Sequence, residues 1–251
     1  MSAKQPPCCL VTGAAGGIGR ALVDVFQRAG YAVIATDLCA RPADLPCTQY
    51  LQADLGRTVD EEAYAAEIFS IISQWLPPEG LKALINNAAV QVLGGVDALS
   101  RQDWAQTLNV NLMAPFVWTQ ALLQPLEIAQ GSVVNISSIH ARLTKKGFVA
   151  YATSKAALSG MTRAMAVDLQ DRVRVNAIEP AAVGTEMLKA GFKHAPESYK
   201  QLENCHPQLR VAEPQEVARL AHAIVEGGAL FLHGSCIDMS GGIGARLYDP
   251  L

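Results

Sequence analysis

The sequence has no apolar run long enough to cross a membrane, because charged residues, glycine or proline interrupt every hydrophobic stretch. Residues 1–7 lack the apolar core of a secretory signal. Basic charge is not concentrated either, since 20 Lys and Arg stand against 23 Asp and Glu, for a net charge of -3. These absences argue against a membrane-bound, nucleic-acid-binding or exported protein and predict a cytoplasmic one.

The cysteines lack the spacing of a disulfide-bonded or metal-binding protein. None of the 6 belongs to a CxxC pair, and neighbours such as Cys8 and Cys9 rarely bridge each other. No group of His, Cys and carboxylate residues has metal-site spacing, and His194 and His206 do not supply it. We therefore predict reduced thiols and no bound metal.

Internal repeats, low-complexity tracts and linkers are absent as well. A chain of 251 residues, 50% of them hydrophobic, is long enough to bury one sizeable core. We predict a single domain over residues 1–251.

Short apolar runs alternate with segments of helical periodicity along most of the chain. Strands are predicted at residues 8–12, 31–36, 47–51, 82–85, 132–136, 173–178 and 235–239. Helices are predicted at residues 18–29, 61–75, 101–126, 149–169 and 213–226. Strands that are apolar on both faces and alternate with helices predict an α/β fold, with one doubly wound parallel sheet and helices on both its faces.

The segment over about residues 186–210 interrupts this alternation and contains Gly, His and Pro, so it is predicted to be irregular. Long loops in compact domains are often lids, which makes a substrate lid one interpretation. A solvated insertion without a role is the other.

The first strand leads into Thr12-Gly-Ala-Ala-Gly-Gly-Ile-Gly19, which opens the first helix. Gly13, Gly17 and Gly19 have no Cβ atom, so backbone and a pyrophosphate can approach each other closely. The helix N-terminus then faces the anion. Strand, turn and helix in this order predict a dinucleotide-binding turn over residues 12–19.

Asp37 ends the second predicted strand, where a carboxylate can accept hydrogen bonds from both hydroxyls of an adenosine ribose. A 2′-phosphate would meet like charge there, so Asp37 favours NAD over NADP. Arg20 and Arg41 keep NADP open as the alternative, because either could reach a 2′-phosphate.

Tyr151 and Lys155 lie at positions i and i+4 of a predicted helix and therefore share one face. A free phenol titrates at about pH 10, and a nearby ammonium lowers that pKa, so Tyr151 could act as an acid or base. Alone, the pair could equally be an aromatic residue packed beside a solvated lysine. Ser138, which follows an apolar strand, favours a catalytic segment over residues 138–155, and its neighbour Ser137 is interpreted as structural.

The TGxxxGxG turn and the YxxxK pair resemble the short-chain dehydrogenase/reductase family, in its shorter branch. Further stretches over nearly the whole chain are similar to family motifs in the same order: Asp54-Leu55, Asn86-Asn-Ala-Ala89, Asn111, Ser138 and Arg174–Pro180 followed by Thr185. The resemblance implies a Rossmann-type fold that binds NAD.

It also implies hydride exchange between the nicotinamide and a small secondary alcohol or its ketone, with Tyr151 as general base or acid. Ser138 would hold the substrate oxygen and Asn111 would help to anchor a water chain. Lys155 would lower the Tyr151 pKa and hold the nicotinamide ribose. The cofactor-binding residues implied by the resemblance are Gly13, Gly17, Ile18, Gly19, Asp37, Asp54, Leu55, Asn87, Tyr151, Lys155 and Thr185.

Two positions depart from the family pattern: Ala89 and Ala181 stand where glycine is usual. A methyl group narrows backbone freedom near the adenine and nicotinamide sites, respectively, so an altered fit is expected, without loss of a reacting group.

Other features leave alternatives open. His140, Arg142 and Lys145 follow Ser138 and are interpreted either as groups that recognise an anionic or polyhydroxylated substrate or as a polar surface loop. The rival functions are an NADPH-dependent 3-oxoacyl-type carbonyl reductase, against which Asp37 argues, and a non-catalytic dinucleotide sensor.

The resemblance further implies a homo-oligomer, a tetramer or a dimer, in which the helices at 101–126 and 149–169 pair across a two-fold axis. The terminal segment 246–251 is a candidate to reach a neighbouring subunit.

Overall fold

The computed structural model describes residues 5–193, 195–226 and 230–247. Within them, seven parallel strands form one sheet in the order β3-β2-β1-β4-β5-β6-β7, which confirms the predicted fold class. The strands are β1 (Cys8–Thr12), β2 (Ala32–Asp37), β3 (Gln49–Gln52), β4 (Ala83–Asn86), β5 (Ser132–Ile136), β6 (Arg174–Pro180) and β7 (Cys236–Met239).

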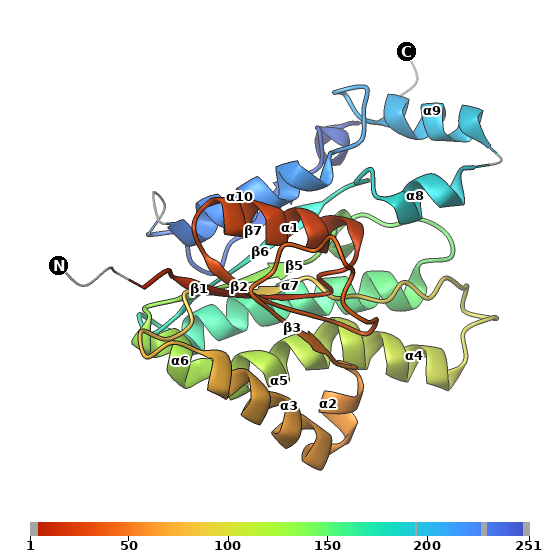
Figure 1. Ribbon diagram of the computed structural model, residues 1–251. Coiled ribbons are helices and arrows are strands. Elements are labelled where there is room, and N and C mark those ends of the chain that lie inside the picture. Colours follow the sequence, from red (N-terminus) through yellow and green to blue (C-terminus); the bar gives the residue numbers. More distant parts are fainter. Residues whose placement is uncertain (1–4, 194, 227–229, 248–251) are drawn as a thin grey trace.

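Helices connect the strands and cover the sheet on both sides (Figure 1). They are α1 (Gly17–Arg28), α2 (Arg57–Asp60), α3 (Glu62–Trp75), α4 (Arg101–Leu108), α5 (Ala114–Ala121), α6 (Leu123–Ile128), α7 (Val149–Leu169), α8 (Glu186–Gly191), α9 (Pro196–Cys205) and α10 (Pro214–Glu226). A π-helical turn, η1 (Asn109–Met113), and two 3-10 turns, η2 (Ile139–Ala141) and η3 (Ile243–Ala245), complete the described elements.

The order of the strands determines where a ligand can bind. The chain runs from β1 to β2 on one side and later places β4 on the other side of β1, so the winding reverses at β1. In open parallel sheets, the crevice for a ligand lies beside the carboxyl ends of the strands at such a reversal. Figure 1 shows α8 and α9 at this same end of the sheet.

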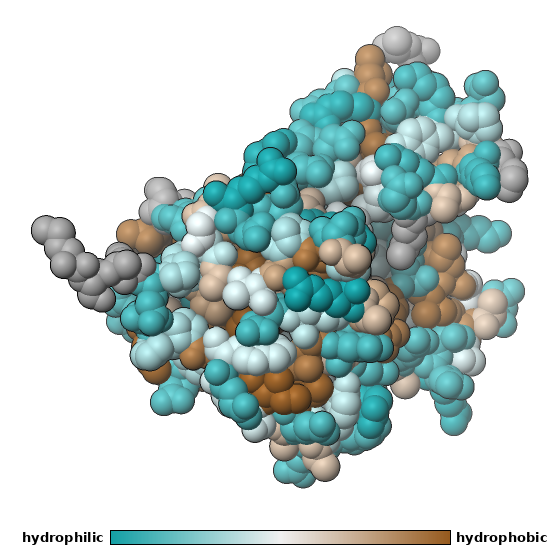
Figure 2. Space-filling view, viewed as in Figure 1, coloured by the Kyte–Doolittle hydropathy of each residue, from teal (hydrophilic) through white to brown (hydrophobic). Residues whose placement is uncertain are grey.

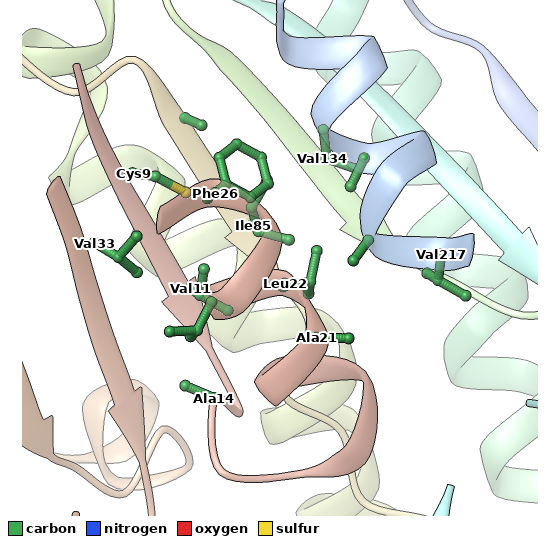
Figure 3. Packing of buried hydrophobic residues seen from close by; sticks show 14 of the residues in the cluster. Cys9, Val11, Ala14, Ala21, Leu22, Phe26, Val33, Ile85, Val134 and Val217 are labelled. Atoms are coloured by element: carbon green, nitrogen blue, oxygen red, sulfur yellow. The ribbon is translucent and has the colours of Figure 1, made fainter. Parts of the chain in front are cut away.

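One hydrophobic core lies between the sheet and the pair α1 and α10. Leu22 and Phe26 of α1 are fully buried against Val11 of β1, and Val217 of α10 belongs to the same cluster (Figure 3). Burying side chains of this size contributes about 1.5–3 kcal/mol each. This core therefore fixes the start of α1 against the carboxyl end of β1.

The second core covers the opposite face with residues of α3, α5 and α6. Trp118 of α5 is fully buried there, contacts Phe69 edge to face and donates from its indole nitrogen to Thr58 Oγ1 at 3.0 Å. Adjacent residues of β1 serve different cores, since Cys9 lies in the first and Cys8 in the second. Strands buried on both faces have the apolar runs from which the sequence predicted them.

The outer surface is mostly hydrophilic on the side of α1 and α10, with separate hydrophobic patches (Figure 2). No helix in the described part of the chain combines the length and apolar character needed to cross a membrane. The cysteines, which all lie in that part, form no disulfide.

The predicted continuous helix over residues 101–126 is wrong. It is divided into α4, the π-helical turn η1, α5 and α6. Pro115 has no N–H to donate to the carbonyl of Asn111, and its ring clashes with that carbonyl in a regular helix. Pro125 has the same relation to Ala121, where α5 ends. By contrast, β5 and α7 have the predicted bounds.

The prediction of an irregular segment over 186–210 is also wrong, because it contains α8 and α9. Thr185 caps α8, with its hydroxyl accepting from the Leu188 N–H at 3.2 Å, and Pro196 occupies the first turn of α9. Both are known helix-start signals. His194 and the tail residues 248–251 lie outside the described residues, so the predictions made for them are not addressed.

Candidate active site

The residues singled out in the sequence lie at the carboxyl ends of the strands or on helices that reach this edge. Gly13 follows β1, Asp37 ends β2, Asn87 follows β4, and Ser138 comes shortly after β5. Tyr151 and Lys155 lie in the first two turns of α7. The predicted dinucleotide turn and the predicted catalytic segment therefore share one edge of the sheet.

The glycine turn is closely packed by the protein itself. A Cβ atom on Gly13, whose φ is +64°, would lie 2.7 Å from Ala88 Cα, and one on Gly19 would lie 2.0 Å from the Gly13 carbonyl oxygen. A Cβ atom on Gly17 would lie 2.7 Å from Thr185 Cγ2. A Cβ atom at any of these positions would force neighbouring atoms to move. Gly17 brings the turn against the segment that follows β6.

The N-terminus of α1 is open to an anion. Gly16 provides no side-chain cap, and the first turn, which includes Ile18, contains no acidic residue. The first N–H groups of a helix carry partial positive charge and bind phosphate groups. Together with the glycine turn, this helix end fits the pyrophosphate of a dinucleotide.

Asp37 is held against the glycine turn. Its Oδ2 accepts from the Ala15 N–H at 2.9 Å, while Oδ1 accepts more weakly from the Cys39 N–H at 3.3 Å. The two arginines that could serve a 2′-phosphate have other partners: Arg20 pairs with Asp44 at 2.9 Å, and Arg41 donates to the Cys47 carbonyl at 2.9 Å.

Asn87 locks the turn to the end of β4. Its amide group donates to the carbonyls of Thr12 and Gly13 at 3.0 and 2.9 Å. The Thr12 hydroxyl in turn accepts from the backbone N–H of Asn87 and of Ala88. Asn87 thus holds the turn in shape through its side chain.

Asp54 and Leu55 follow β3. Asp54 Oδ1 accepts from the N–H of Gly56 at 2.9 Å and of Arg57 at 3.3 Å, which fixes the start of α2. Leu55 is buried in the second core. The Asp54 carboxylate thus bonds within its own turn, while its backbone N–H donates to the Tyr64 hydroxyl at 2.9 Å.

Asn111 joins the two halves of the site through its fully buried side chain. Oδ1 accepts from the Val90 N–H at 2.8 Å, and Nδ2 donates to the Val90 carbonyl at 2.9 Å and to Ser154 Oγ at 3.0 Å. The Ser154 hydroxyl donates to the Tyr151 carbonyl at 2.7 Å. This set of bonds connects η1, the segment after β4 and α7.

Ser138, Tyr151 and Lys155 lie together. Lys155 is only 2% exposed, and its ammonium donates to the Ile136 carbonyl at 2.8 Å and lies 5.7 Å from the centre of the Tyr151 ring. Ser138 is buried at the end of the β5 segment, and its hydroxyl accepts from the His140 N–H at 3.2 Å. A fully buried lysine excludes the interpretation of Lys155 as a solvated surface residue.

The comparison with known proteins agrees with this geometry. A family model described as enoyl-(acyl carrier protein) reductase matches residues 13–244. The match covers most of the chain, from Gly13 past Thr185. The chain belongs to the short-chain dehydrogenase/reductase family.

Relatives of known name agree over almost the full length. Protein FixR of Bradyrhizobium diazoefficiens is 32% identical, covering 95% of this chain and 87% of FixR. Cyclopentanol dehydrogenase of Comamonas is 30% identical, over 94% of this chain and 96% of that enzyme. A 3-oxoacyl-[acyl-carrier-protein] reductase of Thermotoga maritima is 31% identical, over 94% and 96%. The relatives with a named activity are dehydrogenases and reductases, which makes this family member an oxidoreductase.

Solved structures show the same fold. The ligand-free aldohexose dehydrogenase of Thermoplasma acidophilum superposes with a TM-score of 0.90 at 25% identity, covering 98% of this chain and 97% of that one. A 4-hydroxyisoleucine dehydrogenase complexed with NADH has a TM-score of 0.84 at 26% identity, over 96% and 100%. A protein of this same fold therefore binds NADH.

The pKa directions in this family member differ between the two catalytic candidates. Burial lowers the pKa of Lys155 to about 8. Burial raises the pKa of Tyr151, while its hydrogen bond with Ser138 acts in the opposite direction. The downward shift predicted for Tyr151 from Lys155 is therefore not seen in the chain by itself, because desolvation of the phenolate outweighs the favourable contacts.

A ring stack borders Tyr151. The His140 ring lies parallel to the Phe148 ring at 4.3 Å and edge-on to the Tyr151 ring at 5.7 Å. Burial lowers the pKa of His140, and the Lys145 charge adds to this. His140 therefore lies beside Tyr151 as a neutral imidazole near neutral pH, whereas Arg142 forms ion pairs with Glu179 and Asp238.

The two departures from the family pattern cause no backbone strain. Among the described residues other than glycine, φ is positive only at Gln130, Gln170 and Leu209, so Ala89 and Ala181 both adopt conformations open to alanine. Sequence reasoning missed Ser154 and Glu179, which hold other site residues. The available signal for Glu179 was a charge inside an apolar strand.

Proposed function

We propose that this protein is an NAD(H)-dependent oxidoreductase that transfers a hydride between nicotinamide and a small secondary alcohol or its ketone. The observation that carries the proposal is the buried ammonium of Lys155 beside Tyr151 and Ser138, at the same sheet edge as the glycine turn. Burying a lysine costs several kcal/mol. An apolar side chain would fill the same space without this cost, so the buried lysine indicates a chemical role.

In this proposal the cofactor supplies the hydride acceptor or donor, and the chain supplies binding and proton transfer. The α1 N-terminus and the glycine turn hold the pyrophosphate. Thr185 borders the nicotinamide end of the cofactor, and Asp54 and Leu55 border the adenine end. Lys155 holds the nicotinamide ribose.

Ser138 donates a hydrogen bond to the substrate oxygen and fixes it beside the Tyr151 hydroxyl. Tyr151 removes the carbinol proton in oxidation and returns it in reduction. The positive charge of Lys155 stabilises the phenolate form of Tyr151 while that form exists. Asn111 anchors the route by which the proton reaches solvent.

The preference for NAD depends on Asp37. Its carboxylate lies against the glycine turn, and both nearby arginines, Arg20 and Arg41, have other partners. A 2′-phosphate would therefore meet the negative charge of Asp37, and either arginine would have to leave its present partner to reach it. Ribose hydroxyls, in contrast, can donate to this carboxylate.

The experiment is a parallel tryptophan-fluorescence titration with NADH and NADPH. The wild type should bind NADH at least about tenfold more tightly, which corresponds to about 1.4 kcal/mol. Asp37→Ala and Asp37→Asn should both lose the preference, and Asn retains an acceptor for the Ala15 N–H. Asp168→Ala, an exposed change on α7, is the control. Tighter NADPH binding by the wild type would refute the cofactor assignment.

A second candidate is an NADPH-dependent 3-oxoacyl-type reductase, favoured by the similarity to the Thermotoga reductase. The same titration separates the two candidates, because that activity requires the opposite cofactor preference.

We further propose that the whole chain is one domain and assembles as a dimer or tetramer through the α4, α5 and α7 side. Apolar side chains exposed there support this: Met113 and Phe116 are 40% and 39% exposed, and Val167 is 78% exposed. Unpaired cysteines support a reducing compartment, the cytoplasm.

A further inference from the structure

Glu179 is a charged residue inside β6, and its side chain is only 2% exposed. The residues before it on this strand, Ala177 and Ile178, are fully buried and apolar. A buried carboxylate is unfavourable unless ion pairs and hydrogen bonds replace its lost hydration. The partners of Glu179 therefore indicate what it does.

One carboxylate oxygen holds the segment that follows Ser138. Arg142, directly after η2, donates from Nε to Glu179 Oε2 at 2.7 Å. The same guanidinium lies 3.0 Å from Asp238 Oδ2 on β7. Arg142 thus fixes the chain after Ser138 to two strands at once.

The other oxygen holds the chain that precedes Ser138. Ser159 of α7 donates to Glu179 Oε1 at 2.8 Å. The Ser137 hydroxyl lies 2.9 Å from Ser159 Oγ and 3.1 Å from the Lys155 carbonyl, within hydrogen-bonding distance of both. Glu179 therefore reaches the residue before Ser138 as well as the helix that contains Lys155.

We propose that Glu179, acting through Arg142, is a positioning residue that holds Ser138 in place opposite Tyr151. The proposal rests on the proposed function insofar as Ser138 orients the substrate oxygen. It assigns Arg142 to the protein framework in place of a role in recognising an anionic substrate, because Arg142 forms ion pairs with two carboxylates of the chain.

Ser138 needs restraints on both sides because of its place in the chain. Ser138 lies between the strand β5 and the short turn η2, outside the ladder of the sheet. Its carbonyl accepts from the Ala141 N–H at 2.9 Å within η2, so its place relative to the sheet depends on the residues on either side of it. Displacement of a reacting or orienting group by about 1 Å can lower the rate by up to about a hundredfold. A pair of restraints, one on each side of Ser138, prevents such displacement.

The principal variant is Arg142→Gln, because the Arg142 side chain is 45% exposed and its loss opens no core cavity. We expect kcat to fall about tenfold with little change in NADH affinity. Arg172→Gln is the matched control: Arg172 pairs with Glu127 at 2.9 Å and is 48% exposed, but it lies far from Ser138 in the fold. It should retain wild-type kcat.

A double-mutant cycle with Ser138→Ala distinguishes positioning from a general loss of stability. If Arg142 acts through Ser138, Arg142→Gln should have little further effect in the Ser138→Ala background. An equal loss of kcat in both backgrounds would overturn the proposal. Glu179→Gln, which keeps the shape of the side chain, should reproduce the effect of Arg142→Gln.

A titration without substrate tests the proposal even if no turnover is found. The phenolate absorbance of Tyr151, obtained by difference from Tyr151→Phe, reports on its contact with Ser138. His140 and Lys155 also face Tyr151, and all variants retain them. We expect Arg142→Gln and Ser138→Ala to raise the Tyr151 titration midpoint alike, and an unchanged midpoint in Arg142→Gln would contradict the proposal.

Discussion

Lys155 carries an ionisable group that folding removes from water, which is energetically costly. Its side chain is fully buried in α7, and its ammonium donates a hydrogen bond to the Ile136 carbonyl at 2.8 Å. Burial lowers its pKa to about 8, from about 10.4 in an unfolded chain. The unfolded state therefore holds this proton more tightly than the folded state.

This difference predicts a pH dependence of stability. Below about pH 8, Lys155 is charged in both states, so folding includes the full desolvation cost of its ammonium. This cost decreases as the pH rises from about 8 to about 10.4, because the folded state then holds Lys155 uncharged. Between about pH 7 and pH 9.5 the wild type should gain about 2 kcal/mol of unfolding free energy relative to Lys155→Met. Denaturant unfolding of both proteins over this pH range measures the gain. If the free energies of unfolding of the two proteins changed with pH by the same amount, the pKa of Lys155 would not be lowered by folding.

Residue types and spacing were sufficient to predict Gly13, Asp37, Tyr151 and Lys155 as neighbours at one edge, because each has a fixed place in a βαβ or helical pattern. The partners of Arg142 were not predictable. Its ion pairs with Glu179 and Asp238 depend on strands far away in the sequence.

At the scale of elements, the turn before α1 meets the start of α8. Gly17 and Thr185 make this contact, where a Cβ atom on Gly17 would lie 2.7 Å from Thr185 Cγ2. Gly16 next to it is different, since its Cβ atom would meet only the Gly13 carbonyl oxygen at 3.6 Å. Two adjacent glycines thus offer a matched pair of substitutions.

Gly17→Ala should lower the free energy of unfolding by about 1–3 kcal/mol, because α8 must move away from α1 to admit the methyl group. Gly16→Ala should leave it almost unchanged or raise it by up to about 1 kcal/mol. Thermal or denaturant unfolding without added cofactor gives both values. Equal stability of the two variants would refute the close contact.

Elements with uninterrupted patterns, such as β5 and α7, could be predicted with their bounds. The break around Asn111 could have been read from Pro115 and Pro125, since each removes a helical donor. The α8 and α9 helices were not predicted, because Gly, His and Pro in this segment indicated an irregular loop. Thr185 and Pro196, which mark the starts of the two helices, were not used as helix-start signals.

For the whole molecule, the alternation of strands and helices predicted one parallel sheet with helices on both faces, which the structure confirms (Figure 1). The order of the strands and the surfaces that contact a partner did not follow from this alternation. We expect the apolar side chains exposed on the α5 side, Met113 and Phe116, to be covered by a second copy of the chain. Phe116 lies on the side of α5 opposite to the buried residue Trp118.

Phe116→Glu should therefore weaken self-association about 10- to 100-fold, as is usual when a buried interface anchor is replaced. Ile128→Glu, which changes a residue 56% exposed on α6, is the control and should leave association unchanged. Sedimentation or light scattering over a dilution series gives the molecular mass. A wild-type mass of one chain at all concentrations would contradict the expected assembly.

The most direct test of the central claim is the rate of NADH formation from NAD with a panel of small secondary alcohols, compared between the wild type, Tyr151→Phe and Tyr50→Phe. Tyr50 bonds the Cys39 carbonyl at 2.7 Å, away from Ser138, so its loss is the control. We predict turnover by the wild type and by Tyr50→Phe, and a loss of at least about a hundredfold in Tyr151→Phe with NADH binding retained. Undiminished turnover in Tyr151→Phe, or tight NADH binding by a wild type that turns over neither alcohols nor ketones, would contradict the account.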